Sequence, residues 1–186
     1  MVTLGVIADT HVPDKSPRLH PRILEIFRAA GVQAILHAGD ISTPGVLAQL
    51  EQLAPVYAVK GNRDWVYLNH LPLQRTLTFA GVKVGLAHGH GGFWRYFQGK
   101  VQYLRQGYQI ENFVRPLMAD FLEVQVVVFG HTHRAVNLQK WSPLDSVLVF
   151  NPGAACCADQ KENIEPSVGL LRIEDGGRLA GEVIPF

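Results

Sequence analysis

This chain has little of what marks membrane, nucleic-acid-binding or disulfide-rich proteins. Its formal net charge is only +1, so it shows no bulk electrostatic attraction to nucleic acid or to a membrane surface. The sequence has no apolar run long enough to span a bilayer. It also has no internal repeat, low-complexity tract or linker. Its 186 residues suit a single domain with a sizeable core.

Cysteine is scarce too, because the chain holds only the adjacent pair Cys156 and Cys157. Adjacent cysteines rarely bridge each other, so we expect no disulfide framework. We interpret the pair as small buried residues, with metal ligation as the alternative. The first residues carry no basic leader, and Asp9 interrupts the apolar run early, so we expect no signal peptide. These features predict a protein of the reducing cytoplasm.

What the sequence does contain is a series of short apolar runs that end in glycine and polar residues. Residues 2–8, 34–38, 56–59 and 124–128 read as strands, and residues 19–31 and 44–52 as helices. Right-handed crossovers would make the first three strands parallel and place the residues after them on one edge. Further predicted strands are 75–79, 82–87, 135–140, 147–150, 167–173 and 179–184.

The strand predicted at 124–128 leads into two histidines, His131 and His133, which stand two positions apart. In extended backbone, side chains two residues apart point to the same side, so we expect both imidazoles to face one way. Imidazole is a favoured ligand of Zn, Mn, Fe and Ni. Two unrelated surface histidines are the alternative, and the pair alone does not decide between the two interpretations.

Other predicted strands end in the same kinds of residue. Asp9 and His11 follow the first strand, Asp40 follows the second, and Asn62 follows the third. An aspartate at a strand end is often only a turn former. Several such residues on one edge are harder to attribute to chance, so we expect them to gather there. The strand at 82–87 likewise ends at His88 and His90, and we interpret His37, inside the second strand, as packed or supporting rather than metal-binding.

Five short motifs, taken in order, carry a resemblance to a known family. They are Asp9-x-His11, Gly39-Asp40, Gly61-Asn62-Arg63-Asp64, His88-Gly89-His90 and Gly130-His131-x-His133. The set resembles the calcineurin-like metallophosphoesterases, and most of all their small phosphodiesterase branch, which is bacterial and archaeal and also includes the retromer subunit Vps29. The resemblance implies an α/β fold, a four-layer α-β-β-α sandwich with two mixed β-sheets. It implies one domain over residues 1–186, with a helical insertion at about residues 93–123.

The resemblance also implies a binuclear metal site. Carried over motif by motif, the first metal is bound by Asp9, His11, Asp40 and His133. Asp40 bridges to the second metal, whose other ligands are Asn62, His88 and His131. This set of oxygen and nitrogen donors suits Mn²⁺, Zn²⁺, Fe or Ni²⁺ more than Ca²⁺. Mn²⁺ is the first choice because family members often use it.

The implied reaction is hydrolysis of a small phosphate ester, a phosphodiester above all, by a hydroxide held between the two metal ions. The predicted catalytic residues are Asn62, Arg63 and His90. Many relatives have histidine where Arg63 stands, and a guanidinium stays protonated, so Arg63 cannot act as a general acid. We expect it to clasp the phosphate, with a salt bridge to Asp64 as the alternative. Unless His90 or water donates a proton, only esters with good leaving groups should turn over efficiently.

Two other functions remain as alternatives. One is a non-catalytic, Vps29-like protein-interaction scaffold. The other is a nuclease, which is the weaker alternative because the chain has no basic stripe. Residues 93–123 mix aromatic and basic side chains, and they predict two helices broken near Gly107. We favour an inward-packed helical layer there. A lid that meets an anionic substrate, or a surface between copies in a homo-oligomer, is the alternative.

Overall fold

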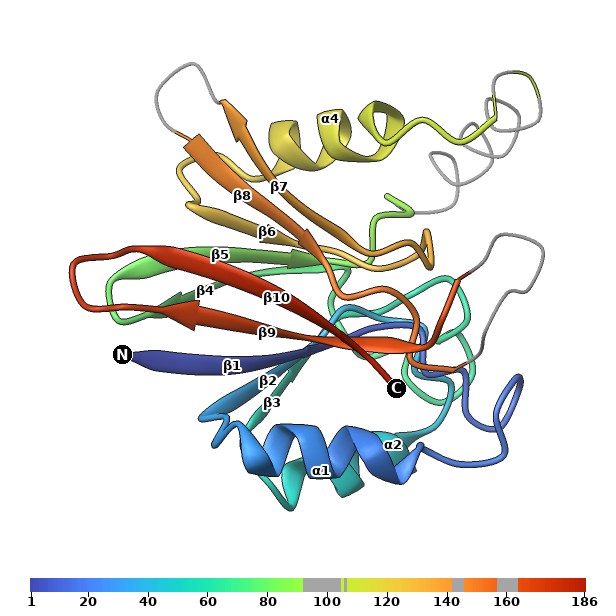
Figure 1. Ribbon diagram of the computed structural model, residues 1–186. Helices are drawn as coiled ribbons and strands as arrows, with labels where there is room; N and C mark the ends of the chain where they lie inside the picture. Colours follow the sequence, from blue (N-terminus) through green and yellow to red (C-terminus); the bar gives the residue numbers. More distant parts are fainter. Residues whose placement is uncertain (92–104, 106, 142–145, 157–163) are drawn as a thin grey trace.

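The computed structural model describes residues 1–91, 105, 107–141, 146–156 and 164–186, and it shows two β-sheets lying face to face (Figure 1). One sheet has the strand order β10-β9-β1-β2-β3 and the other has the order β4-β5-β6-β8-β7. The elements are β1 (Val2–Ile7), α1 (Pro21–Ala29), β2 (Ala34–His37), α2 (Pro44–Glu51), β3 (Val56–Ala58), β4 (Gln74–Phe79), β5 (Val82–Ala87), α4 (Glu111–Asp120), β6 (Val126–Val128), β7 (Val136–Trp141), β8 (Ser146–Asn151), β9 (Ser167–Ile173) and β10 (Leu179–Pro185).

Helices cover the outer faces of both sheets. Figure 1 shows α1 and α2 beneath the first sheet and α4 above the second. Both sheets are mixed, because β1, β2 and β3 pair in parallel while β9 and β10 are antiparallel, and β5, β6 and β8 are parallel while β4 and β7 are antiparallel. The predicted α-β-β-α sandwich and the parallel first strands are therefore confirmed.

The alternation of side chains along the strands separates the core into layers. In β6, Val126 and Val128 point into the core between the sheets, while Val127 packs on the other side beneath α4. In β1, Leu4 and Val6 join the central core, whereas Ile7 packs toward α1 and α2. Successive side chains of a strand point to opposite faces of its sheet, and both faces are covered here. The buried strands therefore read as continuous apolar runs.

The region after residue 91 agrees with its prediction only in part. The second predicted helix is present as α4, with Pro116 inside it. The first predicted helix lies almost entirely outside the described residues. Cys156 is half-buried rather than buried, and Cys157 lies outside the described residues. Within the described parts of the chain, we find no helix with the length and apolar character of a membrane span.

Candidate metal centre

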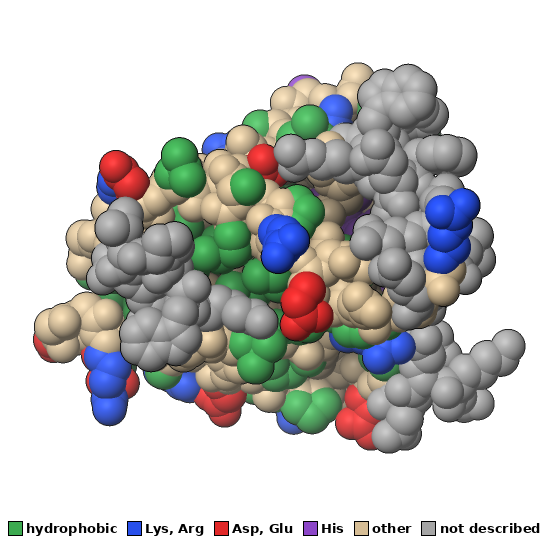
Figure 2. Space-filling model, turned by 90° about the horizontal axis from the view of Figure 1, so that it is seen from above, with side chains coloured by type: hydrophobic (Ala, Val, Ile, Leu, Met, Phe, Trp, Pro, Cys, Tyr) green, Lys and Arg blue, Asp and Glu red, His purple; other side chains and the backbone are tan. Residues whose placement is uncertain are grey.

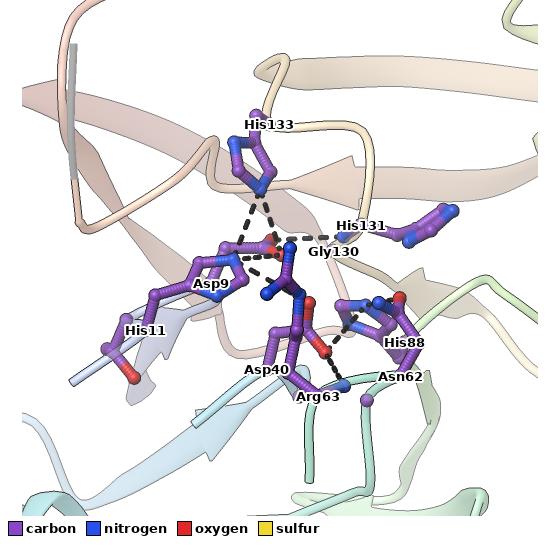
Figure 3. A network of polar contacts seen from close by, with 12 residues as sticks. Asp9, His11, Asp40, Asn62, Arg63, His88, Gly130, His131 and His133 are labelled. Atoms are coloured by element: carbon purple, nitrogen blue, oxygen red, sulfur yellow. Dashed lines mark hydrogen bonds and ion pairs between the residues drawn. The ribbon is translucent and has the colours of Figure 1, made fainter. Parts of the chain in front are cut away.

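The polar residues that follow the strands of both sheets converge at one end of the sandwich (Figure 3). Asp9 and His11 come from the loop after β1, Asp40 from the loop after β2, and His88 directly follows β5. These four side chains are almost entirely buried, at 0–3% exposed. Asn62, His131 and His133, which follow β3 and β6, lie beside them and are partly exposed. The expected gathering of strand-end residues is present.

A first group of donor atoms surrounds the Asp9 carboxylate. Asp9 Oδ1 lies 3.4 Å from His133 Nε2 and 3.7 Å from His11 Nε2. The two Nε2 atoms are themselves 3.4 Å apart. Three ligand atoms of one carboxylate and two imidazoles therefore point at a common centre, and this cluster is compatible with a metal ion.

A second group forms around the Asp40 carboxylate. Asp40 Oδ1 lies 3.4 Å from His88 Nε2, and His88 Nε2 lies 3.1 Å from Asn62 Oδ1. The other oxygen, Asp40 Oδ2, lies 3.6 Å from His11 Nε2, which belongs to the first group. The two oxygens of one carboxylate thus face two different sets of donors, an arrangement that allows the carboxylate to bridge two ions.

The backbone at the site is not extended, so the expected geometry of His131 and His133 is wrong. Their φ angles are +69° and +58°, and Asp9, His11 and Asp40 also have positive φ. Left-handed backbone costs non-glycine residues about 1 kcal/mol or more each, so a concentration of such residues is typical of functional sites. As a result the two imidazoles point to different places, instead of sharing one side.

The ring of His131 lies outside both donor groups in this structure. It extends away from Asp9 and packs beside His88, with ring centroids 5.0 Å apart (Figure 3). The ring of Phe113 in α4 also lies close to it, with ring centroids 6.1 Å apart. The backbone N–H of His131 does take part in the site, because it donates to Asp9 Oδ2 at 3.0 Å. Its assignment as a ligand of the second metal stays a prediction.

The buried charges hold one another in place. Burial alone would raise the pKa of Asp9, but the imidazoles of His11 and His133 hold that pKa well below its usual value. For His88 the effects have the opposite sign. Burial would lower the pKa of this imidazole, but the Asp40 and Asp9 carboxylates raise it to about 9. A divalent cation would take over the positive charge that this imidazolium supplies to the carboxylates.

Three neighbouring histidines behave differently, because burial dominates. It lowers the pKa of His37 and of His131 to about 3, and the pKa of His90 to about 4. These imidazoles are therefore neutral near pH 7. His37 is fully buried, accepts from the Gly39 N–H at 3.2 Å and lies 3.2 Å from Thr10 Oγ1. It supports the loop that carries Asp40 and stands in neither donor group.

Hydrogen bonds also hold the side chains of the candidate ligands in place. The Nδ1–H of His88 donates to the Ala38 carbonyl at 2.7 Å, which leaves Nε2 facing Asp40 and Asn62. Such a bond on the far ring nitrogen is what orients metal-binding imidazoles. Asp40 is held in place by close packing as well. A glycine is required at position 61, because a Cβ there would collide with the backbone nitrogen and carboxylate of Asp40.

Two supporting residues were not assigned this role from the sequence. Asp64 is fully buried and accepts three backbone N–H groups at 2.8–2.9 Å, those of Ile41, Ser42 and Gly61. Asn151 is also fully buried and donates to the Gly130 carbonyl at 2.9 Å. The Asp in Gly61-Asn62-Arg63-Asp64 and the Asn151-Pro152-Gly153 turn were visible in the sequence, but their partners lie far away along the chain.

Arg63 and His90 stand at the edges of the site. The Arg63 N–H donates to Asp40 Oδ1 at 2.8 Å, while its guanidinium pairs with Asp14 at 2.9 Å. The alternative salt bridge to Asp64 is therefore wrong, because that carboxylate is occupied by backbone donors. His90 is buried beside His88, and neither of its ring nitrogens has a hydrogen-bond partner among the described residues.

Aromatic residues of the 93–123 region reach the site where the structure describes them. Phe113 contacts His131, and Tyr108 stacks on Phe113 with ring centroids 5.7 Å apart. Arg134, next to His133, lies over the Tyr108 ring at 4.3 Å. These two aromatic residues therefore form part of the wall behind the histidine loop. The residues before Tyr108 fall mostly outside the described structure.

The donor atoms fit divalent metal ions. Asp9 Oδ1 is buried without a hydrogen-bond partner among the described residues, although two imidazole nitrogens lie within 3.7 Å of it. A buried carboxylate oxygen in that position is costly unless a cation or donor satisfies it. Both groups combine oxygen and nitrogen donors, and thiolate is absent from them, which matches the preference of first-row divalent metals.

Comparison with known proteins agrees with this fold and site. The sequence profile of the calcineurin-like phosphoesterase superfamily domain matches residues 2–176. A probable metallophosphoesterase of Methanothermobacter thermautotrophicus is 35% identical over 181 residues, which are 97% of this chain and 91% of that protein. The chain therefore belongs to the calcineurin-like phosphoesterase superfamily, a class of metal-dependent phosphoesterases.

Two further proteins place it within that class. A phosphodiesterase of Methanocaldococcus jannaschii is 27% identical, and the match covers 92% of this chain and 93% of that protein. The solved structure of Vps29 from Entamoeba histolytica, complexed with Zn²⁺, superposes with a TM-score of 0.66 at 23% identity and covers 99% of each chain. That structural likeness establishes the shared fold.

Proposed function

We propose that this protein is a phosphodiesterase that works with two divalent metal ions, Mn²⁺ first and Zn²⁺, Fe or Ni²⁺ as alternatives. The observation that carries the proposal is Asp40, whose two oxygens face separate donor groups 3.4 Å and 3.6 Å away. The first ion would lie among Asp9, His11, Asp40 and His133, and the second among Asp40, Asn62, His88 and His131.

When bound, the ions would lower the pKa of a water molecule and offset the charge of the phosphate. The protein's own residues do the rest. Asp9 and Asp40 supply negative charge that offsets part of the charge of two cations, and Asn62 presents an uncharged oxygen beside His88. The buried walls limit the access of bulk water, which strengthens the electrostatic interactions inside the site.

Arg63 is positioned to bind the substrate phosphate. Its backbone is fixed to Asp40, its guanidinium is half-exposed, and the side chain runs past Asp40 toward the side of the site where His11 lies (Figure 3). A guanidinium can hold two phosphate oxygens at once but cannot protonate a leaving group. His90, which burial keeps neutral near pH 7, can hydrogen-bond there. We therefore propose a preference for esters with good leaving groups.

The substrate we propose is a small phosphate ester. On the face shown in Figure 2, which α4 covers, the lysine and arginine side chains of the described residues stand apart, between acidic and apolar ones. Among the described residues of this face, the basic side chains therefore form no stripe of the kind that binds nucleic acid.

The test is hydrolysis of bis-p-nitrophenyl phosphate by protein loaded with Mn²⁺. Asp40→Asn should lose nearly all activity and both metals, measured by elemental analysis, while circular dichroism confirms the fold. Glu25→Gln, an exposed acidic residue of α1, is the matched control and should behave as wild type. Metal-loaded wild-type protein that cleaves neither phosphomonoesters nor diesters would refute the proposal.

A Vps29-like interaction scaffold is the second candidate. The observation in its favour is an exposed apolar stretch beside the site, Trp65, Val66 and Tyr67, which are 51%, 79% and 68% exposed. Exposed apolar clusters often mark binding surfaces. A scaffold predicts capture of a protein partner that Val66→Asp abolishes, and no hydrolysis by metal-loaded protein.

A further inference from the structure

We propose that Asp14 is a positioning residue that serves two partners in turn, the guanidinium of Arg63 and the imidazole of His11. The inference rests on the proposed function and concerns how that same site responds to phosphate. Asp14 lies in the loop after β1, and its Oδ2 atom accepts from Arg63 Nη1 at 2.9 Å. The same oxygen lies 4.0 Å from His11 Nδ1.

His11 lacks a partner that a metal-binding imidazole normally has. Its Nε2 atom faces Asp9, Asp40 and His133, so a metal ion would bind there and the ring proton would sit on Nδ1. That Nδ1 atom is buried and has no hydrogen-bond partner among the described residues. Metal-binding histidines usually hydrogen-bond through this N–H to a carboxylate or carbonyl. That bond orients the ring and makes the other ring nitrogen a stronger metal ligand.

The Asp14 carboxylate is suited to that role but is held by Arg63. Both members of the pair are about half-exposed, at 45% for Asp14 and 51% for Arg63. Exposed ion pairs of this kind are weak, whereas an arginine that binds phosphate makes two charge-assisted hydrogen bonds. A phosphate at the site should therefore draw Arg63 away from Asp14.

Once Arg63 turns to the phosphate, Asp14 loses its partner while His11 Nδ1 still needs one. A small movement of the exposed Asp14 side chain closes the 4.0 Å gap to a hydrogen bond. Phosphate binding would then strengthen His11 as a ligand of the first metal. Arg63 and Asp14 should consequently act on metal affinity in opposite directions, because Arg63 competes with His11 for one carboxylate.

The test measures Mn²⁺ affinity by isothermal titration in phosphate-free buffer. Asp14→Ala should weaken the binding of Mn²⁺ by about 10-fold or more, the usual cost of losing a partner behind a ligand. Arg63→Met frees the carboxylate and should tighten the binding of Mn²⁺ relative to wild type. The double variant should match Asp14→Ala, and Asp14→Asn, which keeps an acceptor oxygen, should fall between Asp14→Ala and wild type.

The matched control is Arg22→Met, which breaks a similarly exposed ion pair with Glu25 on α1 and should leave Mn²⁺ affinity unchanged. The inference is wrong if Arg63→Met and Asp14→Ala shift the affinity in the same direction, or if neither shifts it, while wild type binds two Mn²⁺ ions and cleaves the diester. Wild type that binds none of Mn²⁺, Zn²⁺, Fe²⁺ and Ni²⁺ would overturn the proposed function together with this inference.

Discussion

The two sheets contribute different chemistry to the metal centre. The loops after β1, β2 and β3 of the first sheet supply Asp9, His11, Asp40 and Asn62, which include both carboxylates. The loops after β5 and β6 of the second sheet supply imidazoles, those of His88, His131 and His133. The first sheet would therefore provide the charge that attracts cations, and the second would complete their coordination with imidazoles. Neither sheet alone carries either donor group, so the centre exists only where the two sheets face each other.

The largest effect should come from removing charge rather than an imidazole. The Asp40 carboxylate faces both donor groups, so Asp40→Ala should abolish binding of both metals, a loss well beyond the about 100-fold cost of an outer partner. His133→Ala removes one imidazole of the first group and should leave the second metal bound. Elemental analysis measures the difference. An equal number of bound metal ions in the two variants would contradict the different roles proposed for the two sheets.

Metal binding should also stabilise the packing of the two sheets. An ion that binds only the folded state adds about 2.7 kcal/mol to the free energy of unfolding at a free concentration 100 times its dissociation constant. Urea unfolding with Mn²⁺, and again with excess EDTA, measures this difference. The Asp40→Ala variant is the control, since Mn²⁺ should leave its unfolding midpoint unchanged.

A substitution in the loop after β3 should disturb the position of Asp40 without removing a candidate ligand. In Gly61→Ala the new Cβ would collide with Asp40, so we expect about 1–3 kcal/mol lower stability and weaker metal binding. Gly81→Ala is a matched control for the loss of a glycine, because nothing lies within 4 Å of a Cβ there, although its positive φ adds strain. Unfolding curves and Mn²⁺ titrations separate the two, since only Gly61→Ala should change metal affinity.

The smallest effect on metal binding should follow from weakening the hydrogen bonds that support that loop. Asp64→Asn replaces a carboxylate that accepts three backbone N–H groups and brings an amide N–H toward those donors. We expect about 1–3 kcal/mol lower stability, with both metals still bound under saturating conditions. Unfolding in urea and elemental analysis check the two parts of this prediction. An unchanged unfolding midpoint would show that the Asp64 network is not needed.

Much of the fold could be predicted because its signals are local. The run at residues 82–87 matches β5 to the residue, and the other described strands and helices lie within a few residues of their predictions. Periodicity and turn residues act over a few positions, so the sequence displays them directly. The candidate ligands at strand ends could be identified for the same reason, since the end of a strand is a local event.

The amino-acid sequence was enough to predict the strands and the residue types at their ends, because hydrophobic spacing specifies these within short segments. Which donors meet could be learned only from the folded chain. His131 N–H reaches Asp9 across 122 positions, and Arg63 pairs with Asp14, 49 positions away, instead of its neighbour Asp64. Left-handed backbone at His131 and His133 also turned the two rings apart. Such contacts depend on how the two sheets pack and on which partners already occupy each polar group, and no local pattern encodes either.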